Sequence, residues 1–117
     1  MKVPDLENAV IAEAKITQYL LSETHEHGKH KAKFFLPLGF SVAQWEVMRD
    51  ALLRHLQDND VSNIVAKEHS VNYVVEGPMT TPSGKTPLVR SIWAVDVTGI
   101  PSFASAYKIG KIVRKLP

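Results

Sequence analysis

Three histidines and three lysines are concentrated in one short stretch of the chain, residues 25–33. The stretch reads His-Glu-His-Gly-Lys-His-Lys-Ala-Lys, and its three lysines against one glutamate give it a charge of +2. Imidazole exchanges protons near neutral pH, and ammonium groups bind phosphate and stabilise negative charge that develops on it. A helix that began here would add amide groups that favour an anion. The stretch therefore predicts anion binding or phosphodiester chemistry, with an exposed polar loop as the competing interpretation.

The same histidines could instead bind a metal ion. His25 and His27 lie two residues apart and could chelate a metal on an extended segment, but no H-E-x-x-H motif accompanies them. His55 and His69 stand alone in the sequence and are expected at the surface. The chain has no cysteine, which excludes thiolate metal sites, disulfides and cysteine nucleophiles. The sequence also has no phosphate-cradling glycine loop. From these absences together we expect no resident metal and no cofactor.

A second group of candidate residues lies in the expected strands. Arg90 is expected on the sheet face opposite Trp93, where it either binds phosphate or simply lies at a sheet edge. Ser105 and Tyr107 share a strand face and either offer hydroxyl groups to a site or are ordinary strand residues. Trp45 and Trp93 are expected in the core, with stacking on a base as the alternative for either indole.

The net charge of +2 is distributed unevenly along the 117 residues. Residues 1–24 and 34–60 each carry −2, residues 61–107 are neutral, and residues 25–33 and 108–117 carry +2 and +4. Two basic segments on an otherwise acidic or neutral chain favour a polyanionic partner locally, although solvated lysines would give the same pattern. The basic tail is either a short amphipathic segment that docks a partner or a disordered arm that contacts nucleic acid.

Helical patterns occupy the first half of the chain. Residues 12–22 are good helix formers with apolar side chains clustered on one face. Pro37 keeps any helix over residues 29–35 short. Ser41 and Gln44 have the spacing of a capping box. Behind them, apolar residues at intervals of three and four predict a helix of about 15 residues: Trp45, Met48, Leu52 and Leu56.

Alternating patterns follow in the second half and predict antiparallel strands. The strongest segments are residues 71–76, residues 88–97 and the stretch in which Phe103, Ser105 and Tyr107 alternate with smaller residues; residues 61–67 are a weaker fourth strand. Turn residues at 81–85 and 98–101 separate them. This order predicts an α+β fold, with two to three N-terminal helices packed on one face of a three- to four-stranded antiparallel meander. We expect one domain over residues 1–117, with a core over about residues 7–107 and a basic tail at 108–117.

Several short motifs together resemble a family of small bacterial domains of unknown function. They lie at residues 7–11, 15–21, 28–35 (Gly-Lys-His-Lys-Ala-Lys-Phe-Phe), 39–40, 73–75, 82–85, 89–93 and 101–107 (Pro-Ser-Phe-Ala-Ser-Ala-Tyr). Such domains occur as stand-alone proteins and at the ends of larger bacterial toxin chains. Their helices-then-sheet order is similar to that of the barnase-like and RelE-like ribonucleases of toxin–antitoxin and polymorphic toxin systems.

The resemblance implies a metal-independent endoribonuclease, the toxin half of a toxin–antitoxin pair, with RNA and a cognate antitoxin as partners. The residues that it implies as catalytic are Lys29, His30, Lys31, Ser105 and Tyr107. The closing motif of the family tends to read Pro-Arg-Leu-Val-Thr-Ala-Tyr. Here Ser102 replaces its arginine, so Arg90 or Lys108 would have to hold the scissile phosphate.

These observations predict cleavage in which His30 removes a proton from a ribose 2′-hydroxyl and Tyr107 or another histidine protonates the leaving oxygen. The residues expected to bind substrate are Lys33, Arg90, Trp93 and Lys108. The alternative is a non-catalytic interaction protein, such as an immunity protein, antitoxin or adaptor, whose tail binds an acidic protein or nucleic acid. The N-terminus does not read as a signal peptide and no apolar run approaches the length of a membrane span, which predicts a cytoplasmic protein with no membrane partner.

Overall fold

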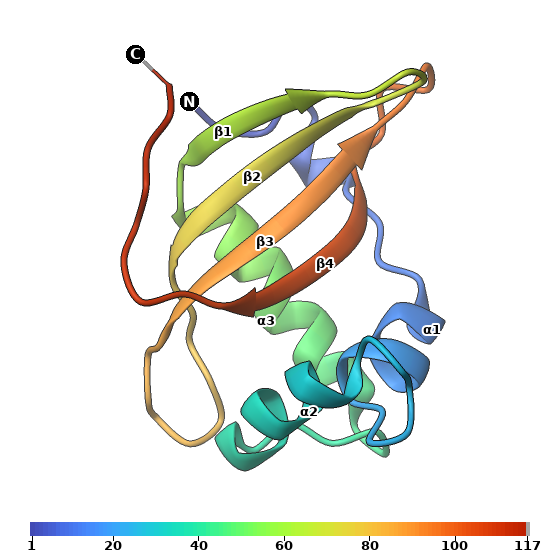
Figure 1. Ribbon diagram of the computed structural model, residues 1–117, viewed down its shortest axis with the longest axis vertical. Helices are drawn as coiled ribbons and strands as arrows, with labels where there is room; N and C mark the ends of the chain where they lie inside the picture. Colours follow the sequence, from blue (N-terminus) through green and yellow to red (C-terminus); the bar gives the residue numbers. More distant parts are fainter. Residues whose placement is uncertain (117) are drawn as a thin grey trace.

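In the computed structural model, which describes residues 1–116, short helical segments precede four antiparallel strands (Figure 1). The helical segments are η1 (Leu6–Asn8), α1 (Glu13–Lys15), η2 (Ile16–Leu20), α2 (Lys29–Phe35), η3 (Leu36–Leu38) and α3 (Trp45–Asp58). The strands are β1 (Val61–Ala66), β2 (Val71–Pro78), β3 (Leu88–Val95) and β4 (Ser102–Lys108). This arrangement confirms the predicted α+β fold.

The first helix is shorter and less regular than the expected span of residues 12–22. One α-helical turn, α1, runs directly into the π-helical segment η2, which ends at Leu20. Ile16 and Leu20 are buried, whereas Tyr19 between them stays half-buried and faces the edge of the sheet. The short helix α2 ends before Pro37 as predicted, and Gly39, with a φ of 99°, closes the following turn.

The longest helix, α3, packs across one face of the sheet (Figure 1). Its apolar stripe is buried at Met48, Leu52 and Leu56, as the spacing predicted. The Ser41 hydroxyl accepts a hydrogen bond from the Gln44 amide at 3.2 Å. That bond closes a turn ahead of the helix and does not cap it, because α3 begins only at the residue after Gln44.

The strands form a meander in the order β1-β2-β3-β4, which includes the weakly predicted first strand. Strand β4 carries a bulge at Ala104, because Trp93 pairs with Phe103 whereas the adjacent Ile92 pairs with Ser105. Phe103 therefore lies in the core beside Trp93, and Ser105 lies on the opposite face. The expectation that the three alternating residues of this strand share a face is wrong for Phe103 for that reason.

The core lies between the helices and one face of the sheet, and it contains a polar group that the sequence patterns did not place there. His55 was expected at the surface but is 1% exposed, because it projects from α3 onto β2 and β3. Its ring is hydrogen-bonded to the Ser91 hydroxyl and to two carbonyl oxygens, those of Gly77 and Val89. Every side-chain nitrogen and oxygen buried within the described chain has a hydrogen-bond partner.

The segment after β4 turns back and runs beside β1, as Figure 1 shows in red. The Ile109 amide donates to the Leu88 carbonyl at 3.1 Å, and the Lys115 amide donates to the Ser62 carbonyl at 2.8 Å. Leu116 packs against the core. Residue 117, the end of the predicted tail, lies outside the described residues. No helix among residues 1–116 has both the length and the apolar character needed to cross a bilayer.

Candidate functional site

The candidate site lies along β4, where the helical segments meet the edge of the sheet (Figure 1). Gly28, the residue before α2, lies so close to η2 that a Cβ there would overlap the Tyr19 carbonyl oxygen. The His25 imidazole holds the connecting loop by accepting hydrogen bonds from the amides of His27 and Gly28 through Nδ1, at 3.0 and 2.9 Å. This packing brings the lysine-rich helix against β4.

Lys31 is the lysine of α2 that faces β4. Its ammonium group lies 5.3 Å from the ring centre of Tyr19 and 5.9 Å from that of Tyr107, which are distances typical of cation–π contacts. The Tyr19 and Ser105 hydroxyls are hydrogen-bonded at 3.0 Å. Burial raises the pKa of Tyr19, but the Ser105 hydrogen bond and the nearby charges of Lys31 and Lys15 outweigh it, so the pKa is lower than usual.

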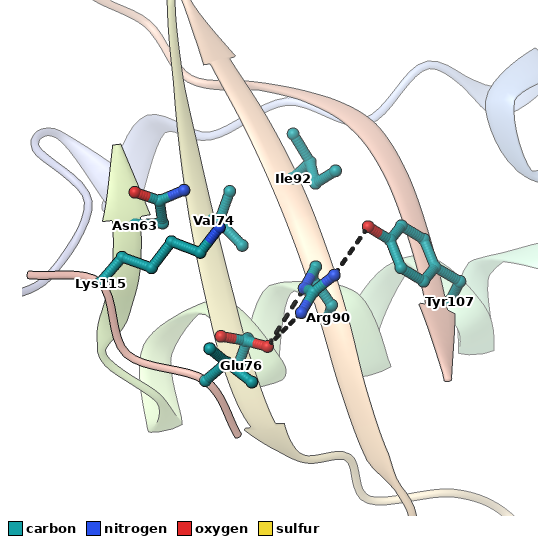
Figure 2. Close-up of a pocket in the computed structure, with 8 residues that line it drawn as sticks. Asn63, Val74, Glu76, Arg90, Ile92, Tyr107 and Lys115 are labelled. Atoms are coloured by element: carbon teal, nitrogen blue, oxygen red, sulfur yellow. Dashed lines mark hydrogen bonds and ion pairs between the residues drawn. The ribbon is translucent and has the colours of Figure 1, made fainter. Parts of the chain in front are cut away.

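Arg90 links the two central strands to β4 across the outer face of the sheet (Figure 2). Its Nε and one terminal nitrogen donate to the same oxygen of Glu76, at 3.1 and 2.7 Å, and its other terminal nitrogen donates to the Tyr107 hydroxyl at 3.1 Å. The hydrogen bonds with Tyr107 and Glu76 raise the pKa of Arg90. A guanidinium group has five N–H donors, so these three contacts leave two for a ligand.

A hollow of about 310 Å³ opens beside Tyr107. Its lining residues come from α2 and from the end of β4: His30, Lys31, Phe34, Tyr107 and Lys108. The Lys108 ammonium lies 5.9 Å from the ring centre of Phe34, so a second cation flanks the hollow. An exposed imidazole, two lysines and a phenol therefore surround one cavity, with Arg90 directly behind the phenol.

One protein-family model, described as "Domain of unknown function (DUF6883)", matches residues 2–110, which is nearly the whole of the chain. The chain belongs to the DUF6883 family. The matched span of this DUF6883 domain includes every helix and strand described above. A search of curated proteins finds no significant match.

A solved structure has the same fold as this DUF6883 domain. It is the "contact-dependent growth inhibition toxin - immunity protein complex from Klebsiella pneumoniae 342". The superposition has a TM-score of 0.69 and 17% sequence identity, and it covers 92% of this chain and 98% of the matched chain. The fold of the DUF6883 domain therefore also occurs within a bacterial toxin–immunity complex.

The DUF6883 structure brings together most of the predicted site residues. His30, Lys31, Tyr107 and Lys108 share the hollow. Two further predicted residues connect to it: Ser105 through the contact of Tyr19 with Lys31, and Arg90 through Tyr107.

The other two lysines of α2 lie elsewhere. Lys29 and Lys33 are exposed, and neither lines the hollow. Each is two residues from Lys31, which is a rotation of about 200° around a helix.

Trp93 is the predicted substrate-binding residue that the structure contradicts. Its indole is completely buried, stacks edge-on against Phe103 and donates its N–H to the Ser91 hydroxyl at 2.9 Å. No face of this ring is open to a base, because helices and sheet enclose it.

Ser102, which the resemblance aligned with an arginine of the closing motif, pairs with Ala94 at the start of β4. Tyr107 is five residues further along this strand, which corresponds to about 16 Å. An arginine at position 102 would therefore lie well away from the hollow.

Two residues of the site were not identified from the sequence. Tyr19 was read only as part of an apolar helix face, although a phenol on such a face needs a polar partner for its hydroxyl. Glu76 alternates with the apolar residues of the strand predicted over residues 71–76, yet its side chain is 1% exposed and is held by Arg90. Its position directly opposite Arg90 in the strand register is the pattern that could have revealed the pair.

Within residues 1–116, no three histidine, cysteine, aspartate or glutamate side chains lie close enough together to hold a metal ion. His25 and His27 are neighbours, with ring centres 6.0 Å apart, but the Nδ1 atom of His25 already accepts two backbone amides.

Proposed function

We propose that this domain is an endoribonuclease of the toxin type, which cleaves RNA by attack of the ribose 2′-hydroxyl on the adjacent phosphodiester. One observation carries the proposal: Lys31 and Lys108 line one hollow together with the Tyr107 phenol and an exposed imidazole, and Arg90 donates to that phenol from the adjoining hollow. Cations bind the phosphate and stabilise the charge that grows on it, and an imidazole exchanges protons near neutral pH.

In the proposed reaction, the scissile phosphate lies between Lys31, Lys108 and the unused donors of Arg90. His30 removes the proton from the 2′-hydroxyl as its oxygen bonds to phosphorus. The bond between phosphorus and the 5′-oxygen then breaks, and the Tyr107 hydroxyl gives its proton to that oxygen. The products are a 2′,3′-cyclic phosphate and a 5′-hydroxyl end.

The contacts of Tyr107 suit the role of an acid. Its oxygen accepts a hydrogen bond from Arg90, and the same guanidinium lies 5.4 Å from the ring centre. Both interactions stabilise the phenolate that forms when the proton leaves. Tyr19 is proposed as a positioning residue, because it holds Ser105 through its hydroxyl and Lys31 through its ring.

The test is cleavage of total RNA by the purified protein in EDTA. We expect products that end in a 2′,3′-cyclic phosphate, and a rate reduced about 10²- to 10⁴-fold by His30→Ala or Tyr107→Phe, since each removes one proton-transfer group. Lys33→Ala is the matched control on the exposed side of α2 and should retain the wild-type rate. RNA left intact by the wild type, or cleaved equally by His30→Ala, would overturn the proposal.

A non-catalytic immunity or adaptor protein is the second candidate, and the observation that favours it is the same fold in a toxin–immunity complex. Induced expression in bacteria separates the two candidates. A toxin should arrest growth, and co-expression of a neighbouring gene product should relieve the arrest. An immunity protein should leave growth unchanged and instead form a tight complex with that product.

A further inference from the structure

A second hollow, of about 410 Å³, lies on the sheet face that points away from the helices (Figure 2). Val74 and Ile92 form its apolar floor, and Arg90 and Tyr107 form one side. Tyr107 lines both this hollow and the one beside His30, so the two cavities adjoin through a single side chain. A nucleotide whose phosphate lay beside Tyr107 would therefore have this second cavity within reach.

Asn63 provides the uncharged polar group that lines this hollow from β1. It pairs with Val74 in the strand register, which places its side chain over the floor, as Figure 2 shows. Its amide group makes no hydrogen bond to any other described residue, whereas the side-chain amide of half-buried Asn59 bonds two carbonyl oxygens. A side-chain amide presents an N–H donor beside a C=O acceptor. Asn63 is therefore free to pair with a ligand that presents an acceptor beside a donor.

The segment after β4 forms the remaining wall. Val113 and Lys115 border the hollow, and the backbone bond from Lys115 to Ser62 fixes this segment beside β1. The wall contributes a cation, because the Lys115 side chain extends over β1 and β2 (Figure 2). This wall lies beyond residue 110, the last residue that the family model matches.

We propose that this hollow binds the nucleobase adjacent to the scissile phosphate, and that Asn63 determines which base is accepted. The inference rests on the proposed function, because it uses the same Tyr107 as its boundary. Apolar floor atoms and the Arg90 guanidinium plane suit stacking of a base, which is how single-stranded RNA is usually held. The Asn63 amide matches a base edge with a donor beside an acceptor, as adenine has at N6 and N7.

The test measures binding without requiring cleavage. Wild-type protein labelled with ¹⁵N is titrated with AMP, GMP, CMP, UMP and ribose 5-phosphate, and the Asn63 side-chain NH₂ resonances are followed. We expect AMP to shift these resonances and to bind about tenfold more tightly than ribose 5-phosphate. Asn63→Ala should remove that preference. Asn72→Ala is the matched control, since Asn72 lies on the same strand as Val74 and does not line the hollow.

Two results would overturn the inference. One is AMP binding no tighter than ribose 5-phosphate, which would leave only a phosphate site. The other is a preference for AMP that Asn63→Ala does not change. Binding that depends on Asn63 in a protein that cleaves no RNA would refute the proposed catalysis and uphold the base pocket. Cleavage without base-dependent binding would uphold the proposed catalysis and refute the base pocket. The two failures are therefore distinguishable.

Discussion

The hydrogen bonds around His55 favour the neutral state of this buried ring. The Trp93 indole donates to the Ser91 oxygen at 2.9 Å, so the Ser91 hydroxyl hydrogen is directed to Nδ1 of His55, 3.0 Å away. Nε2 then carries the proton, which it donates to the carbonyl oxygens of Gly77 and Val89. A second ring proton would face the Ser91 hydroxyl, which would have to turn away. Burial lowers the pKa of His55, although its backbone hydrogen bonds act in the other direction.

This neutral imidazole predicts that acid destabilises the fold. In the unfolded chain His55 takes up a proton as the pH falls below about 6.5, whereas in the folded chain its lowered pKa delays that uptake. The free energy of unfolding should therefore fall below about pH 6.5, by up to about 1.4 kcal/mol per pH unit until the folded pKa is reached. Denaturant unfolding at about pH 7.5 and about pH 5.5 measures the change.

Titration of the His55 ring by NMR in the folded protein provides the direct check. Its resonances should stay those of the neutral Nε2–H tautomer below about pH 6.5, the ordinary pKa of histidine. His69→Gln is the control variant and should leave the pH dependence of unfolding unchanged. A His55 ring that becomes doubly protonated at about pH 6.5 would contradict the prediction.

Single residues also show how far sequence reasoning could reach at the site. Composition identified the lysine and histidine cluster. Strand alternation correctly placed the Arg90 side chain on the sheet face opposite to the one that carries Trp93. Neither could distinguish Lys31 from its neighbours, because which lysine faces β4 depends on the packing of α2 against η2. That packing requires a contact between Gly28 and a carbonyl group nine residues earlier, which no local pattern encodes.

At the scale of elements, the bulge in β4 is the feature on which the site depends. One extra residue, Ala104, reverses the alternation, so that Phe103 joins the core while Ser105 and Tyr107 face the other side. Strict alternation would put all three on one face. The order, number and pairing of the strands followed from sequence periodicity, whereas a single inserted residue leaves no periodic trace.

The junction between η2 and α2 gives a prediction about one glycine. Gly28 has a φ of −85°, which alanine adopts readily, so the cost of Gly28→Ala comes only from overlap with the Tyr19 carbonyl. We expect a loss of about 1–3 kcal/mol in the free energy of unfolding, typical of overpacking. In addition, the contact between Lys31 and Tyr19 should be displaced, which would slow any RNA cleavage.

Denaturant unfolding of Gly28→Ala beside Gly110→Ala makes the comparison. A Cβ at Gly110 would meet no atom within 4 Å, so the control should have wild-type stability or slightly more. Equal stability of the two variants would show that η2 and the start of α2 are not packed against each other at Gly28. The Tyr19 contact can be followed separately, through the ring resonances of Tyr19 in each variant.

At the scale of the whole molecule, the net charge of +2 conceals a basic track along one side. A third hollow, which contains Lys15, Tyr19 and His25, adjoins the one beside Tyr107 through the contact of Tyr19 with Lys31. The cations on the track are Lys15, Lys31, Arg90, Lys108 and Lys115. Glu76, the acid among them, is neutralised by Arg90, so the track presents positive charge.

This track predicts salt-dependent binding of single-stranded RNA. If three to five phosphates are contacted, the logarithm of the binding constant should fall with the logarithm of salt concentration with a slope of about −2 to −3.5. Measurement with uncleavable 2′-O-methyl RNA between about 50 and 200 mM salt tests this. Lys31→Ala should make the slope less negative, by the amount that roughly one phosphate contact contributes. Arg54→Ala, which removes an ion pair with Asp58 on α3, should not change it.

The placement of the chain ends decides how another polypeptide can attach to the sheet. The carbonyl of Met1 and the amide of Lys115 are hydrogen-bonded to Val61 and Ser62 on the outer edge of β1, where Figure 1 shows both of these segments. On the opposite edge, Val10 pairs with the start of β4. Backbone groups that would template an added strand are therefore partly occupied on both sides. The occupied stretches disfavour edge-to-edge aggregation and the addition of a strand at those positions.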